Sequence, residues 1–128
     1  MNIQLNIYGS PLASNAASNA LQFAQLCLEN GHAIKRCFFY FDAVYLGLDS
    51  QAPSSDEQNL LAGWQQLAEQ QVPLLLCIAA ASNRGVLDKA EAERYAKPFA
   101  PMNEVFELVG LGQWAAGFRD TDKIISFK

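Results

Sequence analysis

The chain has 128 residues, of which 51% are hydrophobic, 17% charged and 11% aromatic. This length and composition exclude intrinsic disorder and are typical of one globular domain, so we expect residues 1–128 to form a single domain. The longest nearly apolar stretch, residues 72–81, is about half of a membrane span. No basic start followed by an apolar core opens the chain. We therefore expect a soluble, cytoplasmic protein with no membrane contact.

The charge balance argues against a nucleic-acid partner. Nine Lys and Arg residues against thirteen Asp and Glu residues give a net charge of -4. The basic residues are scattered, and only Lys35 and Arg36 are adjacent. Because phosphate backbones are bound by clustered Lys and Arg side chains, we expect no direct contact with RNA or DNA.

The cysteines narrow the possible chemistry. The chain has three of them, Cys27, Cys37 and Cys77, with no CxxC pair, and His32 is its only histidine. A zinc site needs about four Cys, His or carboxylate ligands at short spacings, so we predict no metal site. Free thiols suit a reducing compartment. A single reactive cysteine is the chemistry that remains.

The first half of the chain predicts two strands separated by a helix. Residues 3–8 alternate between apolar and polar side chains, which indicates a strand. Apolar side chains at helical spacing then predict a helix of about fifteen residues that ends at Asn30, with Gly31 as its cap. The aromatic-rich residues 34–41 predict the second strand, and we interpret residues 42–53 as a loop.

The next segment predicts a helix followed by a buried strand. Ser54, with Glu57 three residues later, is typical of a helix start. The buried stripe of this helix is predicted to hold Leu60, Leu61, Trp64, Leu67 and Ala68. The uninterrupted apolar run 72–78 is typical of a strand that is covered on both faces of a parallel sheet.

The remainder continues the alternation of strands and helices. A polar turn is predicted at 82–85, followed by a short helix capped by Asp88. Two further strands at 106–109 and 124–127 enclose a short helix at 111–118. This pattern predicts an α/β fold with a mainly parallel sheet of about five strands, flanked by helices.

Cys77 is the strongest candidate for a reactive residue. It lies near the carboxyl end of the most apolar predicted strand, where ligands and reactive groups gather in parallel sheets. The backbone N–H groups that follow would favour its thiolate, and Arg84 could add positive charge. A cysteine in an apolar run can also be an ordinary core residue, so both interpretations stay open here.

Other residues have simpler interpretations. We expect Cys27, on a helix face, and Cys37, in the aromatic strand, to be core residues. We interpret His32 as a residue at a helix end. The loop Gly9–Ser14 lies where phosphate-binding loops occur, but it lacks both GxGxxG and the GK[ST] pattern, so we expect an ordinary connection.

Five segments, taken in order over nearly the whole chain, resemble the TusD/DsrE family of sulfurtransferase subunits. They are LQFAQ (21–25), HAIKRCFFY (32–40), SSDEQNLLAGWQQL (54–67), LLLCIAAASNRGVLD (74–88) and FELVGLG (106–112). No single motif is diagnostic, but their joint order is specific. The resemblance implies a DsrE-like fold and maps the reactive cysteine of the family onto Cys77.

The resemblance also implies a place in a cytoplasmic sulfur relay. A persulfide would be accepted on Cys77 from a TusA-type carrier and passed to a TusE-type acceptor, for 2-thiolation of the wobble uridine of tRNA or for sulfur oxidation. TusB- and TusC-like subunits would complete a heterohexamer. No metal or organic cofactor is implied, because thiol exchange needs one activated cysteine.

Two alternatives remain at the level of sequence. The chain could be a non-catalytic scaffold subunit in which Cys77 is merely buried. It could also be a small nucleotide- or flavin-binding α/β protein that uses the Gly9–Ser14 loop. Whether that loop or Arg84 helps to activate Cys77 is left open by the sequence.

Overall fold

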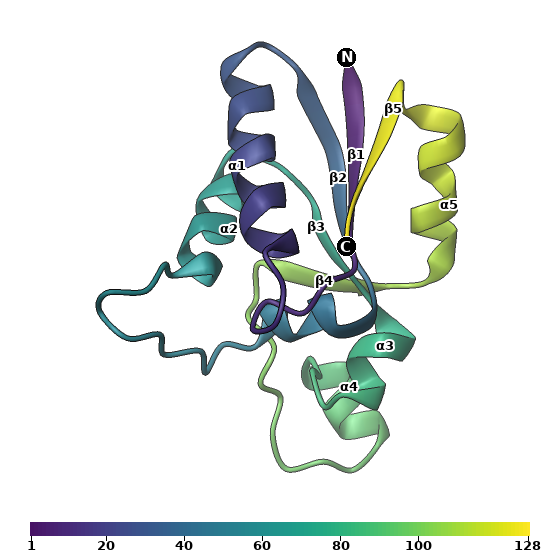
Figure 1. Ribbon diagram of the computed structural model, residues 1–128. Helices are drawn as coiled ribbons and strands as arrows, with labels where there is room; N and C mark the ends of the chain where they lie inside the picture. The colour runs from purple at the N-terminus through teal and green to yellow at the C-terminus, as the bar shows by residue number, and fades with distance from the viewer.

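A five-stranded, entirely parallel sheet forms the centre of the computed structural model, which describes residues 1–128. The strand order is β4-β3-β2-β1-β5. This arrangement confirms the predicted α/β fold with a parallel sheet flanked by helices (Figure 1). The strands are β1 (Asn2–Ile7), β2 (Ala33–Phe39), β3 (Leu74–Cys77), β4 (Phe106–Val109) and β5 (Lys123–Phe127).

The helices form a layer on each face of the sheet and a group beyond its carboxyl edge (Figure 1). Helices α1 (Ala16–Glu29) and α2 (Leu60–Glu69) cover one face, and α5 (Leu111–Asp120) covers the other. None of the helices combines the length and the apolar character that a membrane span requires. Three short helices follow the ends of β2 and β3: the 3₁₀ helix η1 (Phe41–Gly47), α3 (Ile78–Asn83) and α4 (Lys89–Arg94).

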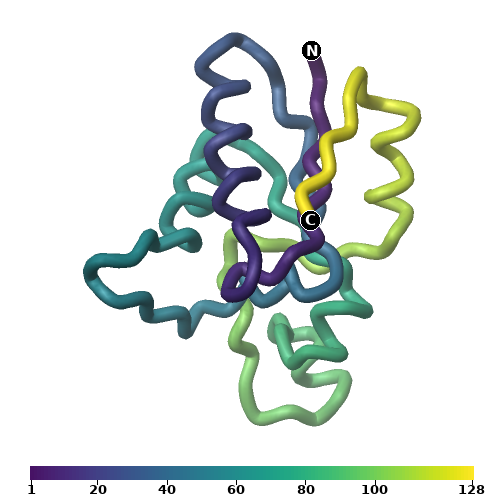
Figure 2. The backbone as a smooth tube through the Cα atoms, viewed as in Figure 1, coloured from purple at the N-terminus to yellow at the C-terminus, as the bar shows by residue number.

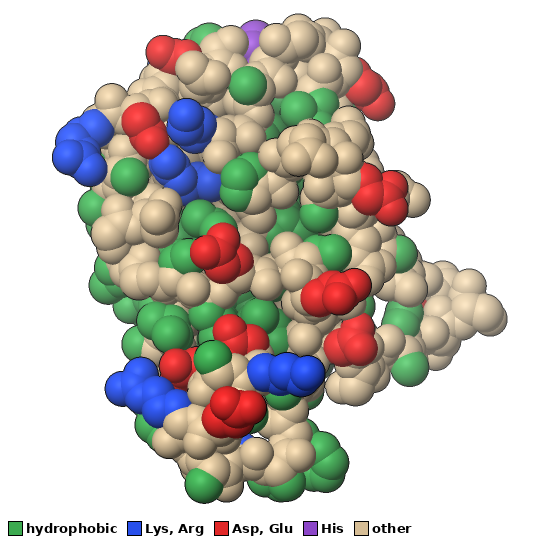
Figure 3. Space-filling view, turned by 180° about the vertical axis from the view of Figure 1, so that it is seen from behind, with side chains coloured by type: hydrophobic (Ala, Val, Ile, Leu, Met, Phe, Trp, Pro, Cys, Tyr) green, Lys and Arg blue, Asp and Glu red, His purple; other side chains and the backbone are tan.

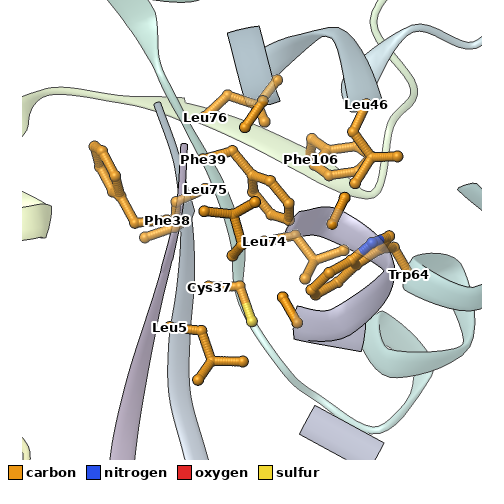
Figure 4. Close-up of a cluster of buried hydrophobic side chains, with 14 of the residues drawn as sticks. Leu5, Cys37, Phe38, Phe39, Leu46, Trp64, Leu74, Leu75, Leu76 and Phe106 are labelled. Carbon is orange, nitrogen blue, oxygen red and sulfur yellow. The ribbon is translucent and has the colours of Figure 1, made fainter. Parts of the chain in front are cut away.

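The face beneath α1 and α2 is apolar. Leu5, Cys37 and Phe39 point toward these helices from paired positions of β1 and β2 (Figure 4). Phe39 meets Trp64 of α2 edge to face at 5.0 Å, and both side chains are fully buried. Phe38 points to the opposite side of the sheet (Figure 4), as the alternation of a strand requires.

The face beneath α5 carries a buried polar network. The guanidinium of Arg36 donates to Gln4 Oε1 at 2.7 Å and to Asp120 Oδ1 at 2.9 Å. The amide of Gln4 donates in turn to Asn6 Oδ1 and to the carbonyl of Trp114, both at 3.0 Å. Because these bonds join β1 and β2 to α5, polar contacts anchor this helix to the sheet.

Two predicted helix ends are confirmed. The helix α1 ends at Glu29, and Gly31 has a φ of 80°, the left-handed conformation that glycine adopts without steric cost. Asp88 caps α4, since its carboxylate accepts a hydrogen bond from the backbone N–H of Glu91 at 2.9 Å.

The predicted helix start at Ser54 is wrong. The helix begins at Leu60, and the side chain of Asn59 caps it by accepting from Ala62 N at 3.1 Å. Residues 54–58 lie in an exposed loop that protrudes from the body of the molecule (Figure 2). The segment has no apolar side chain to bury, so the helix starts where burial starts. The predicted stripe from Leu60 to Ala68 packs in the core.

The second strand also ends earlier than predicted. It stops at Phe39, and Phe41 has a φ of 52°, which breaks the extended conformation. Residues predicted as a loop then form η1, which buries Ala43, Val44 and Leu46 against the sheet. Burying these three apolar side chains in a helical turn is more favourable in free energy than leaving them exposed to water in a loop.

The third strand is shorter than its apolar run. It spans Leu74–Cys77, and Ile78 begins α3. The polar turn predicted at 82–85 is partly helical, and Gly85 has a φ of 77° where the chain reverses. The strand therefore ends at the cysteine itself.

Candidate functional site

The structure places Cys77 at the carboxyl edge of the sheet, as predicted. It is the last residue of β3, where it pairs with Val109 of β4, and it immediately precedes α3. Only 1% of its surface is exposed. A thiol at this place is well situated for exchange with a ligand beyond the strand ends, but it is covered in this conformation.

The pairing register shows which residues surround Cys77. Leu75 pairs with Phe38, so both lie on the same face of the sheet, and Cys77 follows two residues later on that face. Arg36 also lies there, because it bonds to Asp120 of α5. Cys77 therefore faces the side of the sheet that α5 covers.

Tyr40 occupies the neighbouring position on this face. Its N–H continues the ladder by donating to Ile7 O at 2.9 Å, one residue beyond the pair of Phe39 with Leu76. This places Tyr40 level with Cys77. Tyr8 follows on β1 in the same way, since its N–H donates to Phe127 O at 2.9 Å. Cys77, Tyr40 and Tyr8 thus form one row at the carboxyl edge.

A cavity of about 920 Å³ lies along the Tyr40 and Tyr8 part of this row, beneath the start of α5. Its walls are mostly aromatic and apolar, with one cationic side chain, and its volume is in the range of small-molecule sites. Cys77 does not line the cavity, but its neighbour Tyr40 does. The lining residues are Tyr8, Gly9, Tyr40, Phe41, Leu111, Gly112, Trp114, Ala115, Ser126 and Lys128.

The aromatic side chains of the cavity hold one another in place. The indole N–H of Trp114 donates to the hydroxyl of Tyr8 at 3.1 Å. The ring centroids of Tyr40 and Phe41 lie 4.1 Å apart in an edge-to-face arrangement, and the ring centroid of Tyr8 lies 6.4 Å from that of Tyr40. Phe41 is 51% exposed. The wall next to Cys77 is therefore a cluster of aromatic side chains with one open side.

Arg84 is engaged elsewhere than at the thiol. Its Nε donates to Asp42 Oδ1 at 2.9 Å, and its Nη1 donates to the carbonyl of Ala80 at 3.1 Å. Asp42 belongs to η1 and Ala80 to α3, so Arg84 joins the two short helices at the carboxyl edge.

The hydroxyls of the loop Gly9–Ser14 bond to nearby backbone groups, and Ser14 Oγ also donates to the carbonyl of Lys128 at 3.4 Å. Ser10 Oγ accepts from Leu12 N at 3.2 Å, and Ser14 Oγ accepts from Ala16 N at 3.0 Å. A side chain at Gly9 would lie 2.5 Å from Ser14 Oγ, so glycine is needed for this close approach. Such a loop is a compact connection, in agreement with the simpler interpretation of its sequence.

The other two cysteines lie away from the edge. Both are buried, as expected. Cys37 is in the middle of β2, and burial raises the pKa of its thiol far above the ordinary range. Burial also raises the pKa of Cys27 on α1, against a smaller lowering by the terminal ammonium group. His32 lies at the opposite end of the sheet, with its Nδ1 3.0 Å from the amino terminus.

Several residues of the site were not identified from the sequence. Local patterns place Tyr40 in a predicted strand and Asp42 in a predicted loop, and they assign no role in a site to Tyr8 or Trp114. No local pattern could have found them, because the sheet and α5 bring them together from distant parts of the chain. Asp42 lies 42 residues from Arg84, and Tyr8 lies 106 residues from Trp114.

The available groups suit thiol chemistry. No group of three or more His, Cys, Asp or Glu side chains is arranged to hold a metal ion. Lys and Arg side chains are interspersed with Asp and Glu on the face seen in Figure 3. Exchange between a thiolate and a persulfide or disulfide requires only one thiol at the site.

Comparisons with known proteins identify the family and the fold of this chain. The model of the DsrE/DsrF-like family matches residues 1–127. A protein of Enterobacter sp. (strain 638) named Sulfurtransferase TusD is 41% identical over 128 residues, covering 99% of this chain and all of the relative. Its namesake from Cronobacter sakazakii is 38% identical with the same coverage. The crystal structure of the ychN protein from E. coli superposes with a TM-score of 0.82 at 26% identity, covering 99% of each chain.

Proposed function

This chain belongs to the DsrE/DsrF-like family and is a sulfurtransferase, and we propose that it carries the transferred sulfur as a persulfide on Cys77. The observation that carries the proposal is the position of this thiol. Of the three cysteines, only Cys77 ends a strand at the carboxyl edge, whereas Cys37 lies within β2 and Cys27 on α1.

The reaction is an exchange between sulfur atoms. The thiolate of Cys77 attacks the outer sulfur of a carrier persulfide, a new S–S bond forms, and the old S–S bond breaks as the carrier leaves as a thiolate. A thiol of the acceptor then attacks the outer sulfur of the Cys77 persulfide and releases the Cys77 thiolate. Each step exchanges one S–S bond for another, so no external oxidant or reductant is consumed.

The partners proposed for these steps are proteins. We propose a TusA-type donor, a TusE-type acceptor, and TusB- and TusC-like subunits in a heterohexamer with this chain. The terminal product would be 2-thiouridine at the wobble position of tRNA, so we place the relay in the cytoplasm. The relatives named Sulfurtransferase TusD support membership in this relay.

The deciding experiment is the intact mass of the protein after incubation with a persulfide-loaded carrier. We expect the wild type, together with its partner subunits, to gain one sulfur atom, and Cys77→Ser to gain none. The variants Cys27→Ser and Cys37→Ser are matched controls, and both should still gain the sulfur.

The same measurement tests the scaffold alternative, which the burial of Cys77 favours. A scaffold subunit would gain no sulfur even in the presence of its partners. Uptake that persists in Cys77→Ser would also contradict the proposal, because it would place the sulfur on another thiol.

A further inference from the structure

We infer that the ion pair between Asp42 and Arg84 is a latch that controls how often Cys77 opens to the aromatic cavity. The inference rests on the proposed role of Cys77 and deepens it, because a covered thiol must become accessible before it can take up sulfur. Asp42 and Arg84 are then positioning residues, which act through the segments that carry Tyr40 and Cys77.

The latch joins the two chain segments on either side of the thiol. Cys77 leads directly into α3, and Arg84 follows the last residue of that helix. Tyr40, which lies level with Cys77, leads into η1 through Phe41 and Asp42. The bond from Arg84 Nε to Asp42 Oδ1, at 2.9 Å, therefore links the residue two positions after Tyr40 to the residue seven positions after Cys77.

No other ion pair spans these two segments. The remaining pairs join Arg36 to Asp120 and Arg94 to Glu91, beneath α5 and within α4. Arg84 also donates to the carbonyl of Ala80, which fixes its guanidinium against α3. With this geometry, a movement of α3 also moves the guanidinium of Arg84 and, through it, the start of η1.

The backbone next to the latch is strained. Phe41 has a φ of 52°, in the left-handed region that bulky side chains rarely occupy. Such a conformation persists only when the surroundings impose it. The ring centroid of Phe41 lies 4.1 Å from that of Tyr40 and 5.9 Å from that of Tyr8, and the next residue, Asp42, is bound by Arg84. Release of Asp42 would allow the backbone of Phe41 to leave the left-handed conformation and the aromatic cluster to move.

The far end of η1 is fixed, so the movement is confined to its start. A side chain at Gly47 would lie 2.6 Å from Leu76 Cδ1, which shows how closely the end of η1 packs on β3. Phe41, at the other end, is 51% exposed and lines the cavity. Displacement of Tyr40 and Phe41 would connect Cys77 with the cavity of about 920 Å³.

The test measures the rate at which iodoacetamide alkylates Cys77, followed by peptide mass spectrometry in a Cys27→Ser background. Cys37, which is fully buried within β2, is the internal reference for global unfolding. We expect Asp42→Asn and Arg84→Gln to raise the rate at Cys77 by about two- to fivefold, as the strength of an exposed ion pair allows. The rate at Cys37 should stay unchanged.

Two matched variants separate the latch from a general effect of charge. Arg94→Gln removes an ion pair confined to α4 and should leave the rate at Cys77 unchanged. Asp42→Glu keeps the carboxylate and should alkylate more slowly than Asp42→Asn. An unchanged rate at Cys77 in both latch variants would overturn the inference. A parallel rise at Cys77 and Cys37 would overturn it as well, because it would indicate unfolding.

Sulfur uptake from the loaded carrier distinguishes the latch from the proposed function. If the latch variants change alkylation but no protein gains sulfur at Cys77, the latch stands and the proposed function fails. If Cys77 takes up sulfur but its alkylation rate is the same in the wild type and the latch variants, the proposed function stands and the latch fails.

Discussion

The two faces of the sheet are held by different kinds of interaction. Beneath α1 and α2, fully buried apolar side chains such as Phe39 and Trp64 pack edge to face. Beneath α5, the polar side chains of Gln4 and Arg36 bond to one another and to the helix. The apolar face gains stability from the area it removes from water, whereas the polar face depends on a few directed bonds.

The difference also explains where the cavity lies. Gly117 is the only buried residue of α5, while Phe118 on the same helix is 66% exposed. A helix that is anchored at few points leaves room near the strand ends, and the cavity lies there. The well-packed face therefore supports the sheet, and the loosely covered face provides a cavity lined by Tyr40, the neighbour of Cys77.

The largest effect is expected from Trp64→Ala on the apolar face. The indole N–H of Trp64 has no hydrogen-bond partner, so this side chain stabilises the fold through its buried area. Its removal should lower the free energy of unfolding by about 3–5 kcal/mol in urea titrations. Phe118→Ala, the control on the exposed side of α5, should change it by less than about 0.5 kcal/mol. Equal losses in the two variants would contradict the comparison.

An intermediate effect is expected from Gly117→Ala on the polar face. A side chain at Gly117 would overlap the amide of Gln4, whose bonds to Arg36 and Trp114 would break. We expect a loss of about 1–3 kcal/mol in the free energy of unfolding and faster hydrogen exchange in α5. Gly112→Ala, in open space on the same helix, should be neutral or stabilising by up to about 1 kcal/mol. Protection of α5 that survives Gly117→Ala would show that Gln4 does not anchor it.

The smallest effect is a dependence on pH. The hydrogen bond from Arg36 lowers the pKa of Asp120, with weaker help from the charges of Arg36, Lys35 and Arg119. A carboxyl with a lowered pKa in the folded state adds stability above its unfolded pKa of about 3.9, and this stability is lost as the pH falls through the folded value. Urea titrations of wild type and Asp120→Asn should therefore converge in acid and diverge toward neutral pH. A constant difference would show that Asp120 titrates normally.

Much of the fold could be predicted because it follows from local patterns. The alternation in β1 and the apolar run 72–78 identify strands, and Gly31 and Asp88 mark helix ends. The prediction at Ser54 failed because a capping pattern starts a helix only when apolar residues that can be buried follow it directly. The cap that operates, Asn59, lies next to the buried stripe.

The number of thiols, the alternation of apolar and polar side chains in β1, and the position of Cys77 near the end of an apolar run are local properties, so they could be predicted from the sequence. The position of Tyr40 level with Cys77, the bond from Arg84 to Asp42 and the anchoring of α5 by Arg36 become visible only in the folded chain. Strand order and register join residues that are far apart in the chain, and their contacts depend on the packing of the whole sheet.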